Sequence, residues 1–159
     1  MILVTVGTQL AFDRLVIAAD RWLAANPGVT AFAQIGPAAF RPANMAFGDF
    51  VPPDRADALF REAELIVSHA GLGSILTALK YRKPIVIMPR RAALGEHRND
   101  HQLATAKWLG SRPGVKVAWE AGDLGPLLDA RAGLQAGGGI ADAASPELIA
   151  RLRDFIDSP

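Results

Sequence analysis

The chain contains one short unit whose local pattern strongly limits its fold. Residues 64–67 form an apolar run, residues 68–74 form a turn with two glycines, and residues 75–79 begin an apolar pattern at helical spacing. The run is typical of a buried strand, and the pattern after it is typical of a helix that packs on that strand. The unit therefore predicts a strand that turns sharply into a helix, which is the building block of α/β proteins.

The same alternation continues along the chain. Apolar runs that predict strands occupy residues 2–6, 30–35, 47–51, 64–69, 85–88 and 115–118. Helical patterns fall between or after them, at residues 12–23, 54–61, 75–81, 101–109 and 124–128. Strands that alternate with helices favour a parallel sheet with helices on both faces. We therefore expect a Rossmann-like α/β domain over residues 1–132.

A different composition begins after residue 132. Residues 133–144 hold four glycines and few side chains that can pack, which favours a flexible tether. Residues 145–157 then predict an amphipathic helix, because Ser145 suits the N-cap and Pro146 suits the first helical position. Such a helix must bury its apolar stripe, either on its own domain or on a partner. The stripe consists of Leu148, Ile149, Leu152, Phe155 and Ile156.

Composition excludes several classes of protein. The 159 residues include no cysteine, so neither a disulfide framework nor a thiolate metal site can form. The net charge of +1 lacks the basic excess of nucleic-acid-binding domains, so no nucleic-acid partner is expected. No apolar run approaches the roughly 18 residues that cross a bilayer, and the first residues lack a signal-peptide pattern. We therefore expect a cytoplasmic protein, and if it works at a membrane, another molecule must hold it there.

Three polar loops follow predicted strands and are expected to meet at one site. In an open parallel sheet the carboxyl ends of the strands lie at one edge, where ligands bind. The residues concerned are Gly7, Thr8 and Gln9 in the first loop, His69, Gly71, Gly73 and Ser74 in the second, and Arg90, Glu96, His97, Arg98, Asn99, Asp100, His101 and Gln102 in the third.

The second of these loops has the chemistry of a phosphate site. Its glycines let the backbone approach an anion closely. Ser74 is expected to cap the following helix, whose free N–H groups and positive dipole end favour a diphosphate. His69 can donate to phosphate oxygens, and Arg90 can neutralise a departing anion. The alternatives are a structural His69 and an Arg90 that covers the sheet edge at the surface.

The third loop suits a ligand with many hydroxyl groups, because it combines carboxylates, imidazoles, amides and a guanidinium group. A solvated polar loop is the alternative. His97 and His101 lie four residues apart and could share a helix face as metal ligands, with Glu96 or Asp100 nearby. No third well-placed ligand is evident, so no metal is expected. The three tryptophans, Trp22, Trp108 and Trp119, are expected to be core or packing residues.

Four motifs occur in an order and spacing that resembles a known family. They are VGTQxxFDRL at residues 6–15, SHAGxGSI at 68–75, KPIVxMPR at 83–90 and GEHRNDHQ at 95–102. Over residues 1–128 the chain resembles the C-terminal, donor-binding half of GT-B glycosyltransferases of family 28. It is most similar to the small chains of two-chain enzymes. These are the PssE-type exopolysaccharide glucuronosyltransferase subunits and the catalytic subunit of the dolichol-linked N-acetylglucosaminyltransferase.

The resemblance implies roles for individual residues. His69 and Ser74 fall where the related plant-type signature contacts the donor diphosphate, and Gln102 falls where that signature holds the donor sugar. Two positions depart from the signature: Thr77 replaces a glutamate that holds the ribose, and His101 stands at an acidic position, with Asp100 beside it. A hydroxyl makes weaker hydrogen bonds than a carboxylate, so Thr77 is expected to hold the ribose less firmly.

The resemblance further implies the donor-binding subunit of a two-chain, inverting glycosyltransferase. Such a chain binds a UDP-sugar as substrate and needs no cofactor. A membrane-associated partner subunit binds a lipid-linked saccharide acceptor and recruits the chain to the inner face of the cytoplasmic membrane. The transferred hexose belongs to exopolysaccharide biosynthesis. Glucuronic acid is favoured, because the resemblance to the exopolysaccharide type is closer and Arg98 can pair with the sugar carboxylate. N-acetylglucosamine is the runner-up.

The base that activates the acceptor is not identified by the sequence. Glu96 and Asp100 are candidates, because a general base needs a free acceptor group near the reacting hydroxyl. Two other functions stay open: a non-catalytic, nucleotide-sugar-binding regulatory subunit, and another UDP-binding enzyme such as an epimerase.

Overall fold

A six-stranded sheet lies at the centre of residues 1–138, the part of the chain that the computed structural model describes. Every neighbouring pair of strands runs parallel, in the order β3-β2-β1-β4-β5-β6. The structure thus confirms the expected α/β class and the Rossmann-like parallel sheet. The strands are β1 (Ile2–Thr5), β2 (Ala31–Gln34), β3 (Ala46–Gly48), β4 (Leu65–His69), β5 (Ile85–Met88) and β6 (Val115–Val117).

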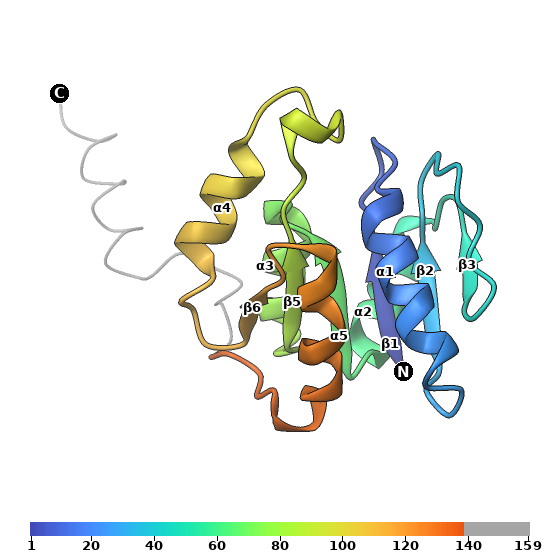
Figure 1. Cartoon of the computed structure of the whole chain (residues 1–159). Coiled ribbons are helices and arrows are strands. Elements are labelled where there is room, and N and C mark those ends of the chain that lie inside the picture. The colour runs from blue at the N-terminus through green and yellow to red at the C-terminus, as the bar shows by residue number, and fades with distance from the viewer. Residues whose placement is uncertain (139–159) are drawn as a thin grey trace, which may run out of the picture.

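Helices cover both faces of this sheet (Figure 1). Alternate residues of a strand point to opposite faces, so Val4 and Val67 join one core cluster while Leu3 and Ile66 join the other. Because both faces are buried, the strands are apolar along most of their length. Helices α1 (Asp13–Ala24) and α5 (Ala121–Asp129) pack on one face, and α2 (Pro53–Glu62), α3 (Leu72–Lys80) and α4 (His101–Leu109) pack on the other.

Helix α5 is longer than its sequence pattern indicates. The pattern predicts a turn or two over residues 124–128, but the helix begins at Ala121. Glu120 and Asp123 form a reciprocal capping box there, in which the Glu120 N–H donates to Asp123 Oδ2 at 2.9 Å. Glycine and proline are poor helix formers, and Pro126 lies inside the helix. The cap and the packing of α5 against α1 therefore outweigh local propensity.

Only Trp22 among the three tryptophans lies in the core. Its indole N–H donates to Asp129 Oδ1 at 2.8 Å, whereas Trp108 and Trp119 are exposed. A core position therefore does not hold for Trp108 and Trp119, which leaves packing as the other expected role. Helical periodicity explains the first case, because Ala106 and Leu109 are the buried residues of α4 and Trp108 falls outside the face that they define.

The end of the described chain packs against the domain. After a short 3-10 turn, η2 (Arg131–Gly133), Leu134 packs against the core cluster that contains α1 and α5. Gly137 is buried, and a Cβ atom there would lie 2.1 Å from the carbonyl oxygen of Pro113. Residues 133–138 are therefore part of the folded domain, which differs from the expected start of a tether at residue 133. The predicted helix over residues 145–157 lies outside the described residues.

The strand order creates a natural binding edge. The chain crosses from β1 to β2 and β3 on one side, and then returns to place β4, β5 and β6 on the other side. Beyond the carboxyl ends of β1 and β4 the flanking connections therefore diverge, and ligands of open α/β sheets bind in the crevice at such a switch point. In residues 1–138, no helix is long and apolar enough to cross a membrane.

Candidate functional site

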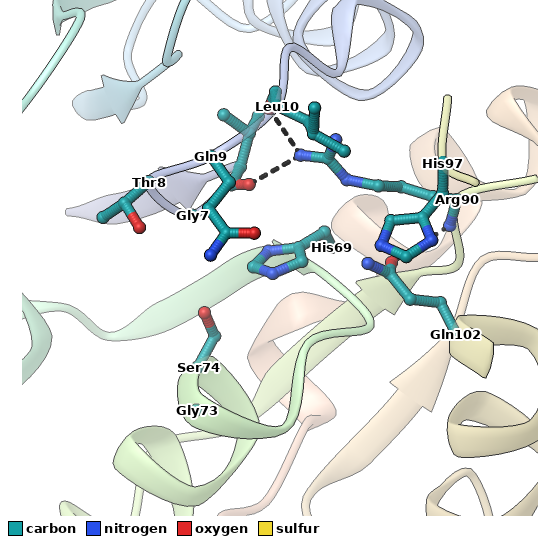
Figure 2. A pocket seen from close by; sticks show the side chains of 11 residues that line it. Gly7, Thr8, Gln9, Leu10, His69, Gly73, Ser74, Arg90, His97 and Gln102 are labelled. Carbon is teal, nitrogen blue, oxygen red and sulfur yellow. Dashed lines mark hydrogen bonds between the residues drawn. The ribbon is translucent and has the colours of Figure 1, made fainter. Parts of the chain in front are cut away.

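A cavity of about 460 Å³ opens at this edge of the sheet, where three loops meet (Figure 2). The loop after β1, the turn after β4 and the segment after β5 all contribute residues to it. The expected convergence of these loops is therefore present. The predicted site residues that line the cavity are Gly7, Thr8, Gln9, His69, Gly73, Ser74, Arg90, His97 and Gln102.

The His69 ring fits between two glycines at the end of β4. A Cβ atom at Gly7 would lie 2.8 Å from His69 Cε1, and one at Gly71 would lie 2.1 Å from His69 Nε2. Gly7 also has a φ of +78°, a backbone conformation that other residues rarely adopt. The absence of side chains at the two glycines thus leaves the space that the His69 ring occupies. Gly71 is therefore needed to accommodate His69, in addition to any role in the approach of a ligand.

The His69 ring is uncharged at pH 7 in this environment. Burial and the nearby charge of Arg90 lower the pKa of His69 from 6.5 to about 4, and a hydrogen bond with the Thr5 backbone opposes them. His69 Nδ1 lies 3.2 Å from the Ser68 hydroxyl. An anion bound beside the ring favours its protonated form. An anion beside the ring would therefore raise the pKa of His69 from this lowered value.

The first turn of α3 faces the same cavity. Gly71 is the N-cap of this helix, and no side chain among the described residues caps this end. The prediction that Ser74 caps the helix is wrong, because α3 begins at Leu72 and Ser74 is its third residue. The Ser74 hydroxyl points into the cavity that Gln9 and His69 also line (Figure 2). A Cβ atom at Gly73 would meet nothing within 4 Å, so space for a ligand remains beside this helix end.

The guanidinium group of Arg90 holds the loop after β1 through hydrogen bonds to its backbone. The residue is 2% exposed, and its terminal nitrogens donate to the carbonyl oxygens of Val6 and Leu10 at 2.7 Å and of Ala11 at 2.8 Å. A weaker bond of 3.3 Å reaches the Glu96 carbonyl. The alternative of a surface arginine is therefore wrong. Most donors of Arg90 bind the protein, so its charge acts on the cavity through the electrostatic field.

Two polar residues that the sequence analysis did not single out also fix this loop. The Gly7 N–H donates to the Thr5 hydroxyl at 3.2 Å, and the Gln34 amide donates to the Gly7 carbonyl at 3.1 Å. Both side chains are buried. The signal that could have revealed Gln34 is an amide at the end of an otherwise apolar strand, where a buried polar group needs a partner.

An ion pair between Arg14 and Glu96 fastens the third loop to the start of α1. Arg14 Nε and Nη2 donate to the two oxygens of Glu96 at 2.7 and 2.8 Å, and the Arg91 N–H donates to Glu96 Oε2 at 2.9 Å. The side chains of Arg14 and Glu96 are 17% and 12% exposed. Both Glu96 oxygens are therefore engaged, which disfavours Glu96 as a general base and as a direct ligand for a sugar hydroxyl.

Asp100 and its neighbours also shape this loop internally. Asp100 Oδ1 accepts the Ala92 N–H at 2.9 Å, and Asn99 Oδ1 accepts the His101 N–H at 3.3 Å. His97 Nδ1 lies 3.2 Å from the Asn99 carbonyl oxygen. None of Asn99, Asp100 and His101 lines this cavity or the second cavity described below. In the described part of the chain, no three His, Asp or Glu side chains form a group that could hold a metal ion.

Gln102 and Thr77 differ in what they offer a ligand. Gln102 Oε1 accepts the Arg90 N–H at 3.1 Å, which leaves the side-chain NH₂ group for the cavity. The Thr77 hydroxyl instead donates to the Gly73 carbonyl at 2.8 Å, one turn earlier in α3. Thr77 does not line the cavity. The position that the resemblance associates with ribose is thus bonded within its own helix.

A second cavity of about 610 Å³ adjoins the first, because both are lined by Gln9, Leu10 and His97. It extends along the third loop over Gly95, Glu96 and Arg98. Arg98 is exposed, and the described residues give it no hydrogen bond or ion pair. The site is therefore a double depression, with the α3 end and His69 in one part and Arg98 in the other.

Solved structures with a similar fold are glycosyltransferases or proteins related to them. The glycotransferase of kitacinnamycin matches with a TM-score of 0.62 at 22% identity, covering 97% of this chain and 37% of its own. Acinetobacter baumannii MurG matches with a TM-score of 0.56 at 25% identity, covering 83% and 42%. This chain thus spans well under half of either protein. ALG13 matches with a TM-score of 0.57 at 18% identity and covers 95% of this chain and 93% of its own.

Sequence comparison gives the family directly. No curated protein sequence matches the chain. A family model does match: the glycosyltransferase family 28 C-terminal domain aligns with residues 1–113, which include the β1 loop, the turn with His69 and the loop to Gln102. The chain therefore belongs to the glycosyltransferase family 28 C-terminal domains and has the fold of the C-terminal half of a GT-B glycosyltransferase.

Proposed function

We propose that this chain binds the donor of a glycosyl transfer, a UDP-sugar, with the diphosphate between His69 and the first turn of α3. One observation carries this proposal: an uncapped helix end, a histidine and the open space at Gly73 meet at the switch point of a family 28 domain. Free backbone N–H groups and the helix dipole attract phosphate oxygens. Ser74 adds a hydroxyl on the same side (Figure 2).

The sugar occupies the second depression in this proposal. His97 lines both cavities, and Gln102, with its free NH₂ group, lines the first. Arg98 is the cation of the outer part, so a sugar carboxylate can pair with it. Glucuronic acid is therefore the favoured hexose, and N-acetylglucosamine, which has no carboxylate, is the alternative.

The reaction requires a base that the described site does not present. No Asp or Glu side chain lines the first cavity, and Glu96 in the second is bonded to Arg14. We therefore propose that a second, membrane-associated chain supplies the base and a lipid-linked saccharide acceptor, with inversion at the sugar. The similarity in length to ALG13 supports a two-chain enzyme. A non-catalytic, nucleotide-sugar-binding regulatory subunit is the alternative function.

Replacement of Gly73 tests donor binding without disturbing the fold. The structure gives a Cβ atom at Gly73 no neighbour within 4 Å, so Gly73→Val fills only space that the ligand needs. Gly122 is the matched control, because it is also the second residue of a nine-residue helix and also has open space around its Cα. Calorimetry with UDP should show affinity reduced about tenfold or more in Gly73→Val. A valine side chain that occupies this space would cost the diphosphate at least one charge-assisted hydrogen bond to the helix end. Equal affinity in the two variants would refute the diphosphate site.

A second measurement separates donor choice from donor binding. UDP-glucuronate and UDP-N-acetylglucosamine are compared with UDP alone in the wild type and in Arg98→Gln. We expect Arg98→Gln to weaken UDP-glucuronate selectively and to leave UDP unchanged, because only the sugar carboxylate needs the cation. An unchanged ratio of the two UDP-sugars would reject glucuronic acid as the favoured sugar while the diphosphate site stands.

A further inference from the structure

The outer side of α3 and α4 carries exposed apolar side chains. Leu72 and Leu76 on α3 are 50% and 42% exposed, and Trp108 on α4 is 63% exposed. These three side chains line one groove of about 390 Å³, which the buried Leu79 and Leu109 also line. An exposed apolar patch of this kind marks a site of contact with a protein or a membrane. We call this surface the α3–α4 face.

Each of the two helices adds a cation to its apolar stripe. Trp108 and Arg112 lie four residues apart on α4 and the turn after it, and the Arg112 guanidinium carbon lies 5.6 Å from the centre of the Trp108 ring. Leu72, Leu76 and Lys80 have the same spacing along α3, and residues four apart share a helix face. Both helices follow strands of a parallel sheet and begin at its carboxyl edge, so the two cations lie toward the opposite edge.

Positive charge is concentrated in this part of the chain. Residues 65–118 contain nine Lys and Arg residues and two acidic residues, Glu96 and Asp100, which both lie in the third loop. Neither α3 nor α4 contains an acidic side chain. Residues 1–64 and 119–138 instead carry six basic and ten acidic side chains. The net charge of +1 for the whole chain therefore conceals a strongly basic segment.

The cations beside Trp108 are not neutralised within the described part of the protein. Lys107 and Arg112 are both exposed, and among residues 1–138 neither side chain has an acidic partner. On the neighbouring helix α2, by contrast, Arg61 pairs with Asp57 at 2.7 Å. An exposed indole ring flanked by unneutralised cations is typical of the interface between a membrane and water.

We propose that the α3–α4 face lies on the surface of an anionic lipid bilayer. Leu76 and Trp108 enter the boundary between headgroups and acyl chains, while Lys107 and Arg112 contact lipid phosphate groups. A bilayer surface offers both an apolar phase and negative charge, whereas a nucleic acid offers no apolar phase for Leu76. The donor cavity stays open, because it shares no lining residue with the groove. The contact needs no nucleotide, so its failure leaves the donor site standing.

Sedimentation with lipid vesicles tests this contact in the full chain. The probes are vesicles of phosphatidylcholine alone and vesicles of phosphatidylcholine mixed equally with phosphatidylglycerol. We expect binding to the anionic vesicles, because each Lys or Arg near such a surface raises the partition coefficient about fivefold. Lys107→Gln combined with Arg112→Gln should therefore weaken binding about 25-fold.

Two controls separate the α3–α4 face from the rest of the surface. Arg21→Gln removes an exposed cation from α1, on the other face of the sheet, and should change binding by less than about twofold. Trp108→Gln should weaken binding about fivefold or more, whereas Phe50→Gln, which removes an aromatic ring that is 62% exposed, should not. Absence of binding to anionic vesicles would indicate a protein partner and overturn the proposal. Equal binding to duplex DNA, or equal losses in the controls, would indicate a general polyanion site and also overturn it.

Quenching of tryptophan fluorescence by brominated lipids locates the contact on the fold. Bromine atoms on the acyl chains quench an indole ring only at short range, so Trp108 should account for most of the quenching. Trp108→Phe keeps an aromatic anchor and should preserve vesicle binding while it loses this signal. Trp119→Phe, which alters the segment between β6 and α5, should keep the signal. The reverse pattern, or no quenching in the wild type, would contradict the proposed orientation.

Discussion

The Arg14–Glu96 ion pair offers a quantitative test of how the third loop is held. A double-mutant cycle combines Arg14→Met with Glu96→Gln and measures the free energy of unfolding of all four proteins. The pair contributes two hydrogen bonds between charged groups, at 2.7 and 2.8 Å. Such bonds are worth about 1.5–3 kcal/mol each when one partner is lost.

Partial exposure reduces this sum. The side chains are 17% and 12% exposed, so water screens part of the attraction. The Arg91 N–H also continues to stabilise Glu96 when Arg14 is replaced. We therefore expect a coupling energy of about 2 kcal/mol, between the values for surface pairs and for fully buried pairs.

Urea denaturation followed by circular dichroism measures each unfolding free energy, and the cycle isolates the pairwise contribution. The exposed pair Arg61–Asp57 on α2 is the control, and its coupling should be far weaker than that of Arg14–Glu96 because water screens both side chains. If the pair also positions the loop, Glu96→Gln should weaken the binding of a UDP-sugar more than that of UDP, because Arg98 and His97 lie on that loop. A coupling below about 0.5 kcal/mol at Arg14–Glu96 would refute the fastening role.

Two further predictions concern His69. The folded-state pKa of His69 is about 4, below the usual 6.5, so the unfolded chain binds more protons than the folded chain between these pH values. The stability that depends on a neutral His69 is therefore present above pH 6.5 and is lost as the pH falls toward 4. His69→Gln should remove a pH-dependent contribution of about 3 kcal/mol, measured by urea denaturation at pH 7 and pH 4; an unchanged pH profile would contradict the burial effect. Gly71→Ala should destabilise the fold by about 2 kcal/mol, because its Cβ atom would lie 2.1 Å from the His69 ring, and His69→Ala should rescue it. Rescue fails if some other contact causes the loss.

Much of the fold follows from local sequence pattern. The six strands and five helices lie close to the segments that periodicity predicts, because an apolar repeat of two or 3.6 residues reports burial directly. The exceptions have local causes that periodicity does not register. Helix α5 depends on a capping box and on packing, and residues 133–138 pack through glycines that a composition analysis assigns to a tether.

The roles of individual site residues were less predictable. Sequence identified which loops meet, since parallel strands end at one edge, and His69 and Gly73 do line the cavity at that edge. It did not distinguish side chains that face a ligand from those that hold the loops. Arg90 and Glu96 look like ligand groups in a motif, but their partners are the carbonyls of residues 6–11 and Arg14, which lie about 80 residues away in sequence.

The sequence by itself therefore determined the α/β class, the resemblance to the family and the loops that meet at the cavity, because these depend on residue type and spacing along each segment. Only the tertiary structure decided that Gly71 makes room for His69, that burial keeps His69 neutral, and that Arg90 and Glu96 fasten loops. Those properties depend on distances between distant segments and on exclusion of water, and neither quantity is encoded in local spacing.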